Sequence, residues 1–277
     1  MNVPKVTVIT PVYRKRETIM DTIKSVCTQT YPDIQFIIVD DGPYSVDESI
    51  GDYIESFNTI SDYLIIHNER NMGTSFSLNR GVEESKGDII FNIADDDCFY
   101  DSDVIMDWVM EFTKTDAEVI TCKRAIYDKT LLHFDRIDPS DEVFEKIKTM
   151  TNQELFDEMS GYNLIFGSVT AKKRSLFEKP YGKYSTDYHI IEDYSSNMVL
   201  LRNGVKFYFY DRVAIKYREG GVSSAGNIDS VYLKESNRLF KREILPFVSS
   251  KIKSIYKYER WKMGVKISSW RKSRDKE

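Results

Sequence analysis

The sequence predicts an α/β fold with a mostly parallel central sheet, because short apolar strands alternate with helical segments through its first half. Four runs rich in β-branched and aromatic residues are predicted as strands, at 6–9, 35–39, 63–66 and 88–93. Between them, apolar residues recur at the helical spacing over 17–29, 47–57 and 74–85. Strands that alternate with helices of this length form βαβ units, whose neighbouring strands run parallel.

Breaker residues mark where these elements end. Pro32 closes the first helical segment, the turn that starts at Asp40 closes the second strand, and Gly87 ends the third helix. The carboxyl ends of parallel strands meet at one edge of the sheet, where such folds bind their ligands. Three of these ends carry polar or turn-forming residues: Thr10-Pro11-Val12-Tyr13, Asp40-Asp41-Gly42 and Asp95-Asp96-Asp97.

The second half of the chain is less regular. We expect strands at 117–126 and 207–217, and helices starting near 102 and spanning 152–159 and 190–202. Asn203-Gly204 is a plausible end for the last of these helices. Between 128 and 150, breakers such as Pro139 predict a long loop, and loops of that length are usually functional or mobile.

The composition is that of an ordinary globular protein, with 277 residues of which 41% are hydrophobic and 30% charged. Three widely spaced cysteines, three histidines and no Cys-x-x-Cys argue against a zinc site and for a reducing compartment. The start of the chain lacks the basic and apolar regions of a signal peptide, and no run approaches the ~20 apolar residues that span a bilayer. We therefore expect a cytoplasmic protein.

Charge divides the chain into an acidic body and a basic tail. Residues 241–277 contain 12 Lys and Arg against 4 Asp and Glu, so they carry +8 while the rest carries −13 of the net −5. We expect a helical basic tail over 228–277, where basic residues are mixed with aliphatic and aromatic ones. That pattern suits the inner face of a membrane, and equally a helix packed on the domain or on a second copy in a homodimer. The acidic body argues against nucleic acid as a partner.

Three consecutive carboxylates, Asp95, Asp96 and Asp97, follow the buried fourth strand. Adjacent carboxylates repel one another, which raises their pKa values unless a cation neutralises them. Asp95 and Asp97 point the same way in an extended segment, and two converging carboxylates suit Mg²⁺ or Mn²⁺. The alternative is a solvated acidic turn that precedes a helix.

Several short stretches stand in a fixed order between residues 5 and 225: Val8-Ile9-Thr10-Pro11-Val12-Tyr13, Ser25-Val26-Cys27-Thr28-Gln29-Thr30-Tyr31-Pro32, Ile38-Val39-Asp40-Asp41-Gly42, Asn71-Met72-Gly73, Asn79-Arg80-Gly81, Lys86-Gly87-Asp88, Asp95-Asp96-Asp97, Glu192-Asp193, Tyr217-Arg218 and Gly220-Gly221-Val222-Ser223-Ser224. Together they resemble the inverting family-2 glycosyltransferases, which use nucleotide sugars and have the GT-A fold. The resemblance implies a GT-A domain over 1–227, with a nucleotide-sugar-binding half (1–100) and an acceptor-binding half (101–227), followed by the tail.

The resemblance also implies roles for individual residues. Asp95 and Asp97 would hold Mn²⁺ or Mg²⁺, although Ala94 stands where many relatives carry Asp, so which two of the three carboxylates bind the metal stays open. Contacts to the nucleotide sugar are implied for Thr10, Pro11, Tyr13, Asp40, Asn71, Asp95, Asp96, Lys216 and Arg218. For Arg218 the alternative is a surface ion pair with Glu219.

Glu192 and Asp193 correspond to the family's Glu-Asp pair, and we expect Asp193 to be the catalytic base. An inverting transfer needs one carboxylate to take the proton of the acceptor hydroxyl. The alternative is that acidic residues at the start of a helix only stabilise it through the helix dipole.

The resemblance thus implies a metal-dependent, inverting hexosyltransferase. Its donor would be a UDP-sugar or similar nucleotide sugar, and its acceptor a saccharide or lipid-linked sugar in bacterial surface polysaccharide synthesis.

One alternative is a sugar-phosphate nucleotidyltransferase, which would carry a Gly-rich loop where this chain has Thr10-Pro11-Val12-Tyr13-Arg14. Another is a non-catalytic nucleotide-sugar-binding module, which would need the three aspartates but not Asp193. A dinucleotide-binding fold would need Gly-x-Gly-x-x-Gly after the first strand, and that motif is absent.

Overall fold

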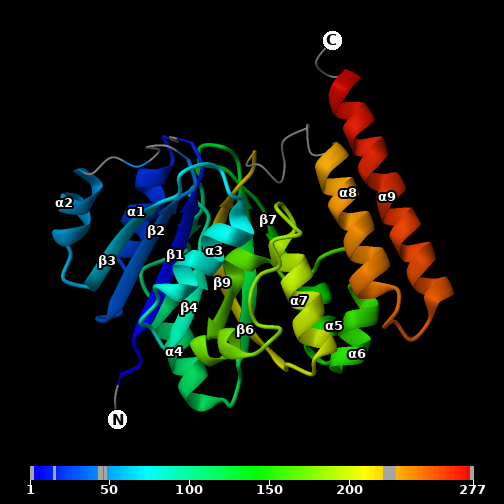
Figure 1. The fold of residues 1–277 in the computed structure, drawn as a ribbon, viewed down its shortest axis with the longest axis horizontal. Helices are drawn as coiled ribbons and strands as arrows, with labels where there is room; N and C mark the ends of the chain where they lie inside the picture. Colours follow the sequence, from blue (N-terminus) through cyan, green and yellow to red (C-terminus); the bar gives the residue numbers. More distant parts are fainter. Residues whose placement is uncertain (1–2, 15–16, 43–45, 47–48, 221–228, 275–277) are drawn as a thin grey trace.

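The first half of the chain alternates strands and helices as predicted (Figure 1). The computed structural model describes residues 3–14, 17–42, 46, 49–220 and 229–274, with backbone only for 229–230 and 268–274. The elements of this half are β1 (Val6–Val12), α1 (Ile19–Cys27), β2 (Ile34–Asp40), α2 (Ser49–Glu55), β3 (Ile60–His67), α3 (Thr74–Glu83) and β4 (Ile89–Asn92). Strands β3, β2, β1 and β4 lie side by side in that order, and every pair is parallel.

The second half extends the same sheet. Its elements are β5 (Cys98–Phe99), α4 (Val104–Lys114), β6 (Val119–Tyr127), β7 (Phe134–Asp138), α5 (Asp141–Lys148), α6 (Asn152–Glu158), η1 (Gly167–Val169), β8 (Thr170–Lys173), η2 (Arg174–Glu178), α7 (Glu192–Arg202) and β9 (Phe207–Arg218). Beyond β4 the order continues as β8, β6, β9 and β5, with β7 beside β6. Strand β9 is parallel to β6, whereas β5, β7 and β8 pair antiparallel. The predicted α/β class with a mostly parallel sheet is confirmed.

Helices cover both faces of the parallel half of the sheet. Val8 and Phe36 pack in one cluster with residues of α1, α2 and α4, among them the fully buried Trp108. Ile9, which follows Val8, points to the opposite face and packs with α3 and η2. Strands buried on both faces read as continuous apolar runs, which is why β1, β2 and β4 could be predicted from sequence.

The long loop predicted at 128–150 is wrong, because β7 and α5 occupy most of it. Strand β7 pairs antiparallel with β6. Helix α5 begins at an N-cap, where the side chain of Ser140 accepts from the backbone N–H of Val143. Phe144 and Ile147 are buried. The apolar spacing over these residues is helical, but breaker residues on either side concealed it.

The tail contains α8 (Asp229–Leu239), the π-helical turn η3 (Phe240–Ile244) and α9 (Lys251–Arg274). Helices α8 and α9 lie side by side at the end of the molecule opposite α2 (Figure 1). The ring of Tyr258 stacks on Phe240 with centroids 4.1 Å apart and contacts Trp261 at 5.6 Å. In the part of the chain that the structure describes, no helix combines the length and apolar character needed to cross a membrane.

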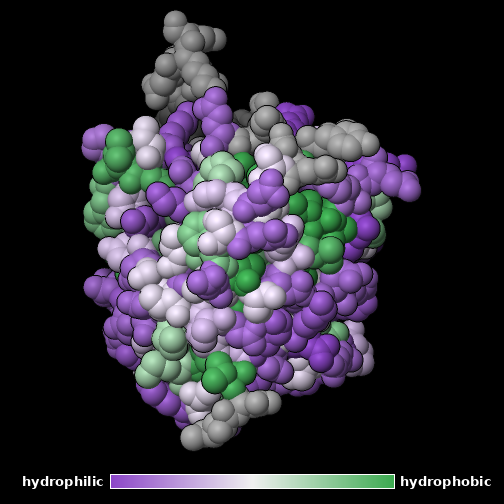
Figure 2. All heavy atoms as spheres, turned by 90° about the vertical axis from the view of Figure 1, so that its left-hand side faces the viewer, coloured by the Kyte–Doolittle hydropathy of each residue, from purple (hydrophilic) through white to green (hydrophobic). Residues whose placement is uncertain are grey.

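The opposite end of the sheet finishes at β3, whose residues are mostly half-buried or exposed. Figure 2 shows this face covered largely by hydrophilic side chains, with hydrophobic ones in separate small groups. A polar covering of this kind protects an edge strand from pairing with another chain.

Candidate active site

The three carboxylates after β4 form a turn that packs against the start of α1; we call Asp95–Asp97 the acidic turn. Asp97 is 1% exposed and Asp95 is also buried, whereas Asp96 is half-buried. Thr22 Oγ1 donates to the carbonyl oxygen of Asp97 at 2.7 Å, and Thr18 Oγ1 donates to that of Asp95 at 3.2 Å. Burial, with a smaller contribution from the Asp96 carboxylate, raises the pKa of Asp97 to about 8.

Arg218 at the end of β9 fixes that strand against the acidic turn. Its backbone N–H donates to Asp97 Oδ1 at 3.0 Å, and its Nε donates to the carbonyl oxygen of Asp96 at 2.9 Å. Its Nη1 donates to the carbonyl oxygen of Lys129 at 2.6 Å, and its Nη2 pairs with Asp21 at 2.7 Å. The ion pair that the structure gives for Arg218 is therefore with Asp21, not with Glu219.

Asp41, at the end of β2, holds the loop that leads into α3. Its carboxylate accepts from Asn68 Nδ2 at 2.7 Å and from the backbone N–H groups of Met72 and Gly73, both at 2.8 Å. Gly73 has a φ of 89°, and a Cβ built there would lie 2.4 Å from the ring of His189. Glycine is favoured at this point because other residues rarely adopt that φ and a Cβ would force the His189 ring to move.

A second carboxylate pair, Glu192 and Asp193, opens α7; we call it the helix-start pair. Asp193 Oδ2 accepts from the backbone N–H of Gly167 at 3.0 Å and from Asn163 Nδ2 at 3.1 Å. Its Oδ1 accepts from the backbone N–H of Tyr194 at 2.6 Å. Burial raises the pKa of Asp193, and these hydrogen bonds oppose that shift because they stabilise the ionised form.

Lys172 of β8 is a buried cation near the helix-start pair. It is 4% exposed, and its Nζ donates to Ser196 Oγ at 3.1 Å and to Tyr184 Oη at 3.3 Å. Burial lowers the pKa of Lys172 to about 8, while the Asp193 and Glu192 carboxylates act in the opposite direction. Burial first, and then Asp193, raises the pKa of Glu192 well above its usual range.

Asp97 of the acidic turn and both residues of the helix-start pair line the same cavity of about 340 Å³, whereas Asp95 and Asp96 do not line it. Pro11, Asp97, Lys172 and Asp193 all contribute to its lining, from β1, the acidic turn, β8 and α7. Cavities of this size, with a few convergent polar groups, are typical small-molecule sites.

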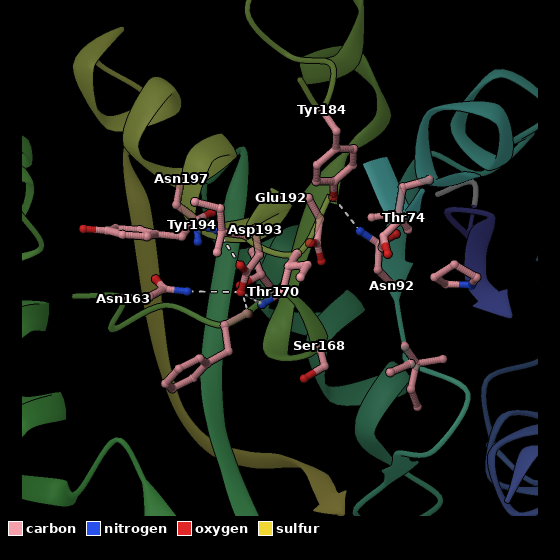
Figure 3. Close-up of a pocket in the computed structure, with 18 of the residues that line it drawn as sticks. Thr74, Asn92, Asn163, Ser168, Thr170, Tyr184, Glu192, Asp193, Tyr194 and Asn197 are labelled. Carbon is pink, nitrogen blue, oxygen red and sulfur yellow. Dashed lines mark hydrogen bonds between the residues drawn. The ribbon is translucent and has the colours of Figure 1, made fainter. Parts of the chain in front are cut away.

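Figure 3 shows how the walls of the cavity are arranged. Glu192 and Asp193 come from α7 on one side, and Thr74 and Asn92 come from α3 and β4 on the other. Asn163 points directly at Asp193. The site is therefore built between the two halves of the chain.

A family model described as glycosyl transferase family 2 matches residues 7–178, more than half of the chain. The chain belongs to this family. Glycosyltransferase GlyA of Streptococcus pneumoniae serotype 4 is 24% identical over 226 residues, which cover 79% of this chain and 31% of that protein. The chain thus spans about a third of the length of this curated relative.

Solved structures of similar proteins support the fold of this family member. Staphylococcus aureus TarS 1–349, in complex with UDP-GlcNAc, aligns with a TM-score of 0.66 at 15% identity, over 93% of this chain and 71% of that one. The mannosyltransferase PcManGT of Pyrobaculum calidifontis, in complex with GDP-Man and Mn²⁺, aligns with a TM-score of 0.68 at 14% identity, over 97% and 74%. The predicted GT-A fold and family are confirmed.

The structure brings some of the predicted nucleotide-sugar residues to the cavity and leaves others beside it. Pro11 lines the cavity, and the hydroxyl oxygen of the neighbouring Thr10 is buried with no hydrogen-bond partner among the described residues. Tyr13 is 37% exposed, and hydrogen bonds from Asn71 and Arg14 lower the pKa of its phenol. Tyr13 and Asn71 are therefore neighbours, as a shared binding role requires.

Asp40 is fully buried, and its described contacts stabilise the turn after β2. Its carboxylate accepts from the backbone N–H groups of Gly42 at 3.2 Å and Val46 at 3.4 Å, and its Oδ2 lies 3.0 Å from His67 Nδ1. Its contact with a base or ribose stays a prediction.

Lys216 lies on β9 opposite Cys98, with its Nζ 5.6 Å from the centroid of Tyr100. Neither Lys216 nor Arg218 lines the cavity. The predicted residues Gly221-Val222-Ser223-Ser224 lie outside the described part of the chain.

Sequence reasoning missed several cavity residues, above all Lys172, Arg124 and Tyr232. The guanidinium of Arg124 lies between the rings of Phe166 and Tyr217, at 3.5 and 4.2 Å from their centroids, and pairs with Asp138 at 2.8 Å. Strand alternation could have indicated only that Lys172 faces the side of the sheet opposite to Ala171 and Lys173, not that this side is buried.

Proposed function

We propose that this family-2 enzyme is a metal-dependent, inverting glycosyltransferase that uses a nucleotide sugar, most simply a UDP-sugar, as donor. One observation carries the proposal: Asp97 and Asp193 line the same cavity. A transfer of this kind needs carboxylates that hold the metal bound to the diphosphate, and a separate carboxylate near the acceptor. The cavity offers both, and its volume of about 340 Å³ suits a sugar held between them.

Asp193 is the proposed catalytic base. Three N–H groups fix its carboxylate, and Oδ1 accepts from only one of them, which leaves a lone pair for an acceptor hydroxyl. As the acceptor oxygen bonds to the anomeric carbon, the bond from that carbon to the diphosphate oxygen breaks. The diphosphate leaves with the electron pair, and the hydroxyl proton passes to Asp193. A single displacement of this kind inverts the configuration at the anomeric carbon.

Asp97 and Asp95 are the proposed metal ligands. Within the described residues, no group of three or more His, Cys, Asp and Glu side chains is arranged to hold a metal ion. Mg²⁺ is commonly bound through one or two carboxylates together with substrate phosphates, so this donor set fits a cation that binds with the diphosphate. The raised pKa of Asp97 supports this fit, because a bound cation would favour its ionised form. When bound, the cation would neutralise charge on the departing diphosphate.

A thermal-shift panel tests the donor and the metal together. UDP-, GDP- and dTDP-sugars are each added with Mn²⁺, Mg²⁺ or EDTA, to the wild type and to Asp97→Ala. A ligand at 100 times its Kd adds about 2.7 kcal/mol of stability. A metal-dependent shift with one nucleotide class, lost in Asp97→Ala, is the expected result. No shift with any donor in the presence of metal would contradict the proposed site.

We also propose that the acceptor is a saccharide or lipid-linked sugar of surface polysaccharide synthesis, met at the inner face of a membrane. The support is α9, whose Ser254 and Tyr258 are buried against the domain. Its opposite side exposes an apolar stripe with four-, seven- and four-residue spacing, made of Ile252, Tyr256, Met263 and Ile267. Exposed basic residues flank the stripe: Lys251, Lys253, Arg260 and Lys266. An apolar stripe between cations suits an anionic lipid surface.

Co-sedimentation with vesicles tests this part of the proposal. Binding to vesicles that contain anionic phosphatidylglycerol, weak binding to pure phosphatidylcholine, and loss of binding in Ile252→Asp are expected. Concentration-dependent dimerisation without vesicle binding would assign the stripe to a second copy instead.

A further inference from the structure

Helix α8 of the tail contacts the segment that leads directly into the helix-start pair. Glu235 is 5% exposed, and its two carboxylate oxygens accept from consecutive backbone N–H groups. Oε1 accepts from His189 at 2.9 Å and Oε2 from Ile190 at 3.0 Å. Two residues further on, α7 begins at Glu192.

This contact holds the backbone immediately before α7. The N-cap of α7 is Ile191, so the N–H groups of His189 and Ile190 lie just outside the helix and do not belong to its first turn. Partly buried N–H groups are costly when unpaired, and a carboxylate beside a helix start also interacts favourably with the helix dipole. Glu235 supplies that carboxylate from a different element of the chain.

The same segment is held from its other side by α3. Ser75 Oγ donates to the carbonyl oxygen of Tyr188 at 2.5 Å, and Asn79 exchanges two hydrogen bonds with the backbone of Tyr184 at 2.8 and 2.9 Å. Arg238, one turn after Glu235 on α8, donates to the carbonyl oxygen of Asp187 at 2.9 Å. The segment 184–190, which leads to the proposed base Asp193, is therefore held by hydrogen bonds from both α3 and α8.

Tyr232, one turn before Glu235 on α8, reaches the cavity itself. Its ring contacts Trp261 of α9 with centroids 5.8 Å apart. Burial, with a smaller contribution from the Asp193 carboxylate, raises the pKa of Tyr232 to about 12, so the phenol near the proposed base stays neutral.

We propose that α8 belongs to the transfer site. Glu235 is a positioning residue that fixes the position of Asp193, and Tyr232 closes the cavity beside Asp193. The proposal rests on the proposed function of the same site. It means that the site extends past residue 227, where the sequence alone ended the catalytic domain. Small displacements of a catalytic group lower the rate steeply, so a loosened segment lowers kcat more than it weakens donor binding.

The test compares Glu235→Gln and Glu235→Ala with Glu243→Gln in the full chain. Glu243 of η3 accepts from Arg202 Nη1 at 2.7 Å, so it joins the tail to the far end of α7 and serves as a matched control. Glutamine keeps one accepting oxygen of Glu235, so Glu235→Gln should fall between wild type and Glu235→Ala.

Two readouts are needed. Amide hydrogen exchange of a peptide spanning 186–196 does not depend on substrate, and it should quicken in both Glu235 variants but not in Glu243→Gln. The second is steady-state UDP release with Mn²⁺ and the UDP-sugar that gives the largest thermal shift. Glu235→Gln should lower kcat about tenfold with KM within about twofold.

Each outcome bears on a distinct claim. If Glu235→Gln keeps wild-type exchange and kcat, or if Glu243→Gln lowers kcat equally, Glu235 only helps the tail to fold and the inference is overturned. If the wild type neither binds nor turns over any UDP-sugar, the proposed function fails. In that case the exchange measurement still tests whether Glu235 stabilises the segment before α7.

Discussion

The acidic turn and the helix-start pair are chemically alike in sequence, yet the structure surrounds them differently. Asp97 has acidic neighbours on its own turn, and the backbone N–H of Arg218 donates to it while the guanidinium of Arg218 pairs with Asp21. Asp193 receives three N–H groups and lies near the buried cation of Lys172.

This difference separates the proposed roles of the two sites. Adjacent carboxylates repel one another, so we expect the acidic turn to favour a cation from solution. A carboxylate whose charge is already balanced by fixed groups can exchange a proton without one. We therefore attribute the different proposed roles of the two aspartates to their environments rather than to residue type.

The largest effect is expected for Asp193→Asn. It should lower kcat about 10³-fold, because general-base catalysis is lost, while the metal-dependent thermal shift with donor stays. Steady-state turnover and the thermal-shift panel measure the two quantities separately. Turnover close to wild type would remove Asp193 from the chemistry.

Asp97→Asn should show the converse pattern. Asparagine can still accept from the Arg218 N–H, but it brings no charge, so the metal-dependent thermal shift should vanish and kcat/KM should fall about 10²-fold. Asp96→Asn is the comparison, because Asp96 belongs to the same turn but is only half-buried. A larger loss in Asp96→Asn than in Asp97→Asn would move the metal to a different pair of the three carboxylates.

Lys172→Met should change the pH dependence of the reaction. The Lys172 cation lowers the pKa of Asp193, so its removal raises that pKa, and the base then loses its proton only at higher pH. The acid limb of the kcat profile should therefore move to higher pH, with a loss of rate on that limb and recovery at alkaline pH. A profile that falls by the same factor at every pH would mean that Lys172 acts on the shape of the cavity instead.

The smallest effect is expected away from both carboxylate sites. Tyr13→Ala should raise the donor Kd about fivefold, since loss of stacking on a base costs roughly 1 kcal/mol or more. Tyr13→Phe keeps the ring and should bind nearly as the wild type does. Equal losses in both variants would assign the effect to the hydroxyl and its contact with Asn71.

The parallel half of the fold and the acidic turn could be predicted from the sequence because their signals are local. Strands β1, β2 and β4 are continuous apolar runs, and the topology of such sheets brings their carboxyl ends to one edge. Which of Asp40 and Asp41 holds the loop before α3 could not be predicted, because both close the same strand. Only the folded loops reveal that Asp41 holds the residues before α3.

The other wall of the cavity depends on contacts between distant segments. Lys172 belongs to a short strand whose position follows from its pairing with β4 on one side and β6 on the other. Glu235 and Tyr232 belong to a tail that looks like a separate amphipathic helix, and their part in the cavity arises from docking. Pairing and docking of this kind leave no periodic trace in the sequence.

The spread of the cavity along the chain also has a consequence for biosynthesis. Pro11 comes from the first strand and Tyr232 from α8, so the walls meet only after most of the polypeptide has left the ribosome. A nascent chain that has emerged as far as β9 already carries the acidic turn, but it lacks Tyr232 and Glu235. Since domains fold as they are synthesised, we expect such an intermediate to fold its parallel sheet before α8 can hold the segment that leads into the helix-start pair.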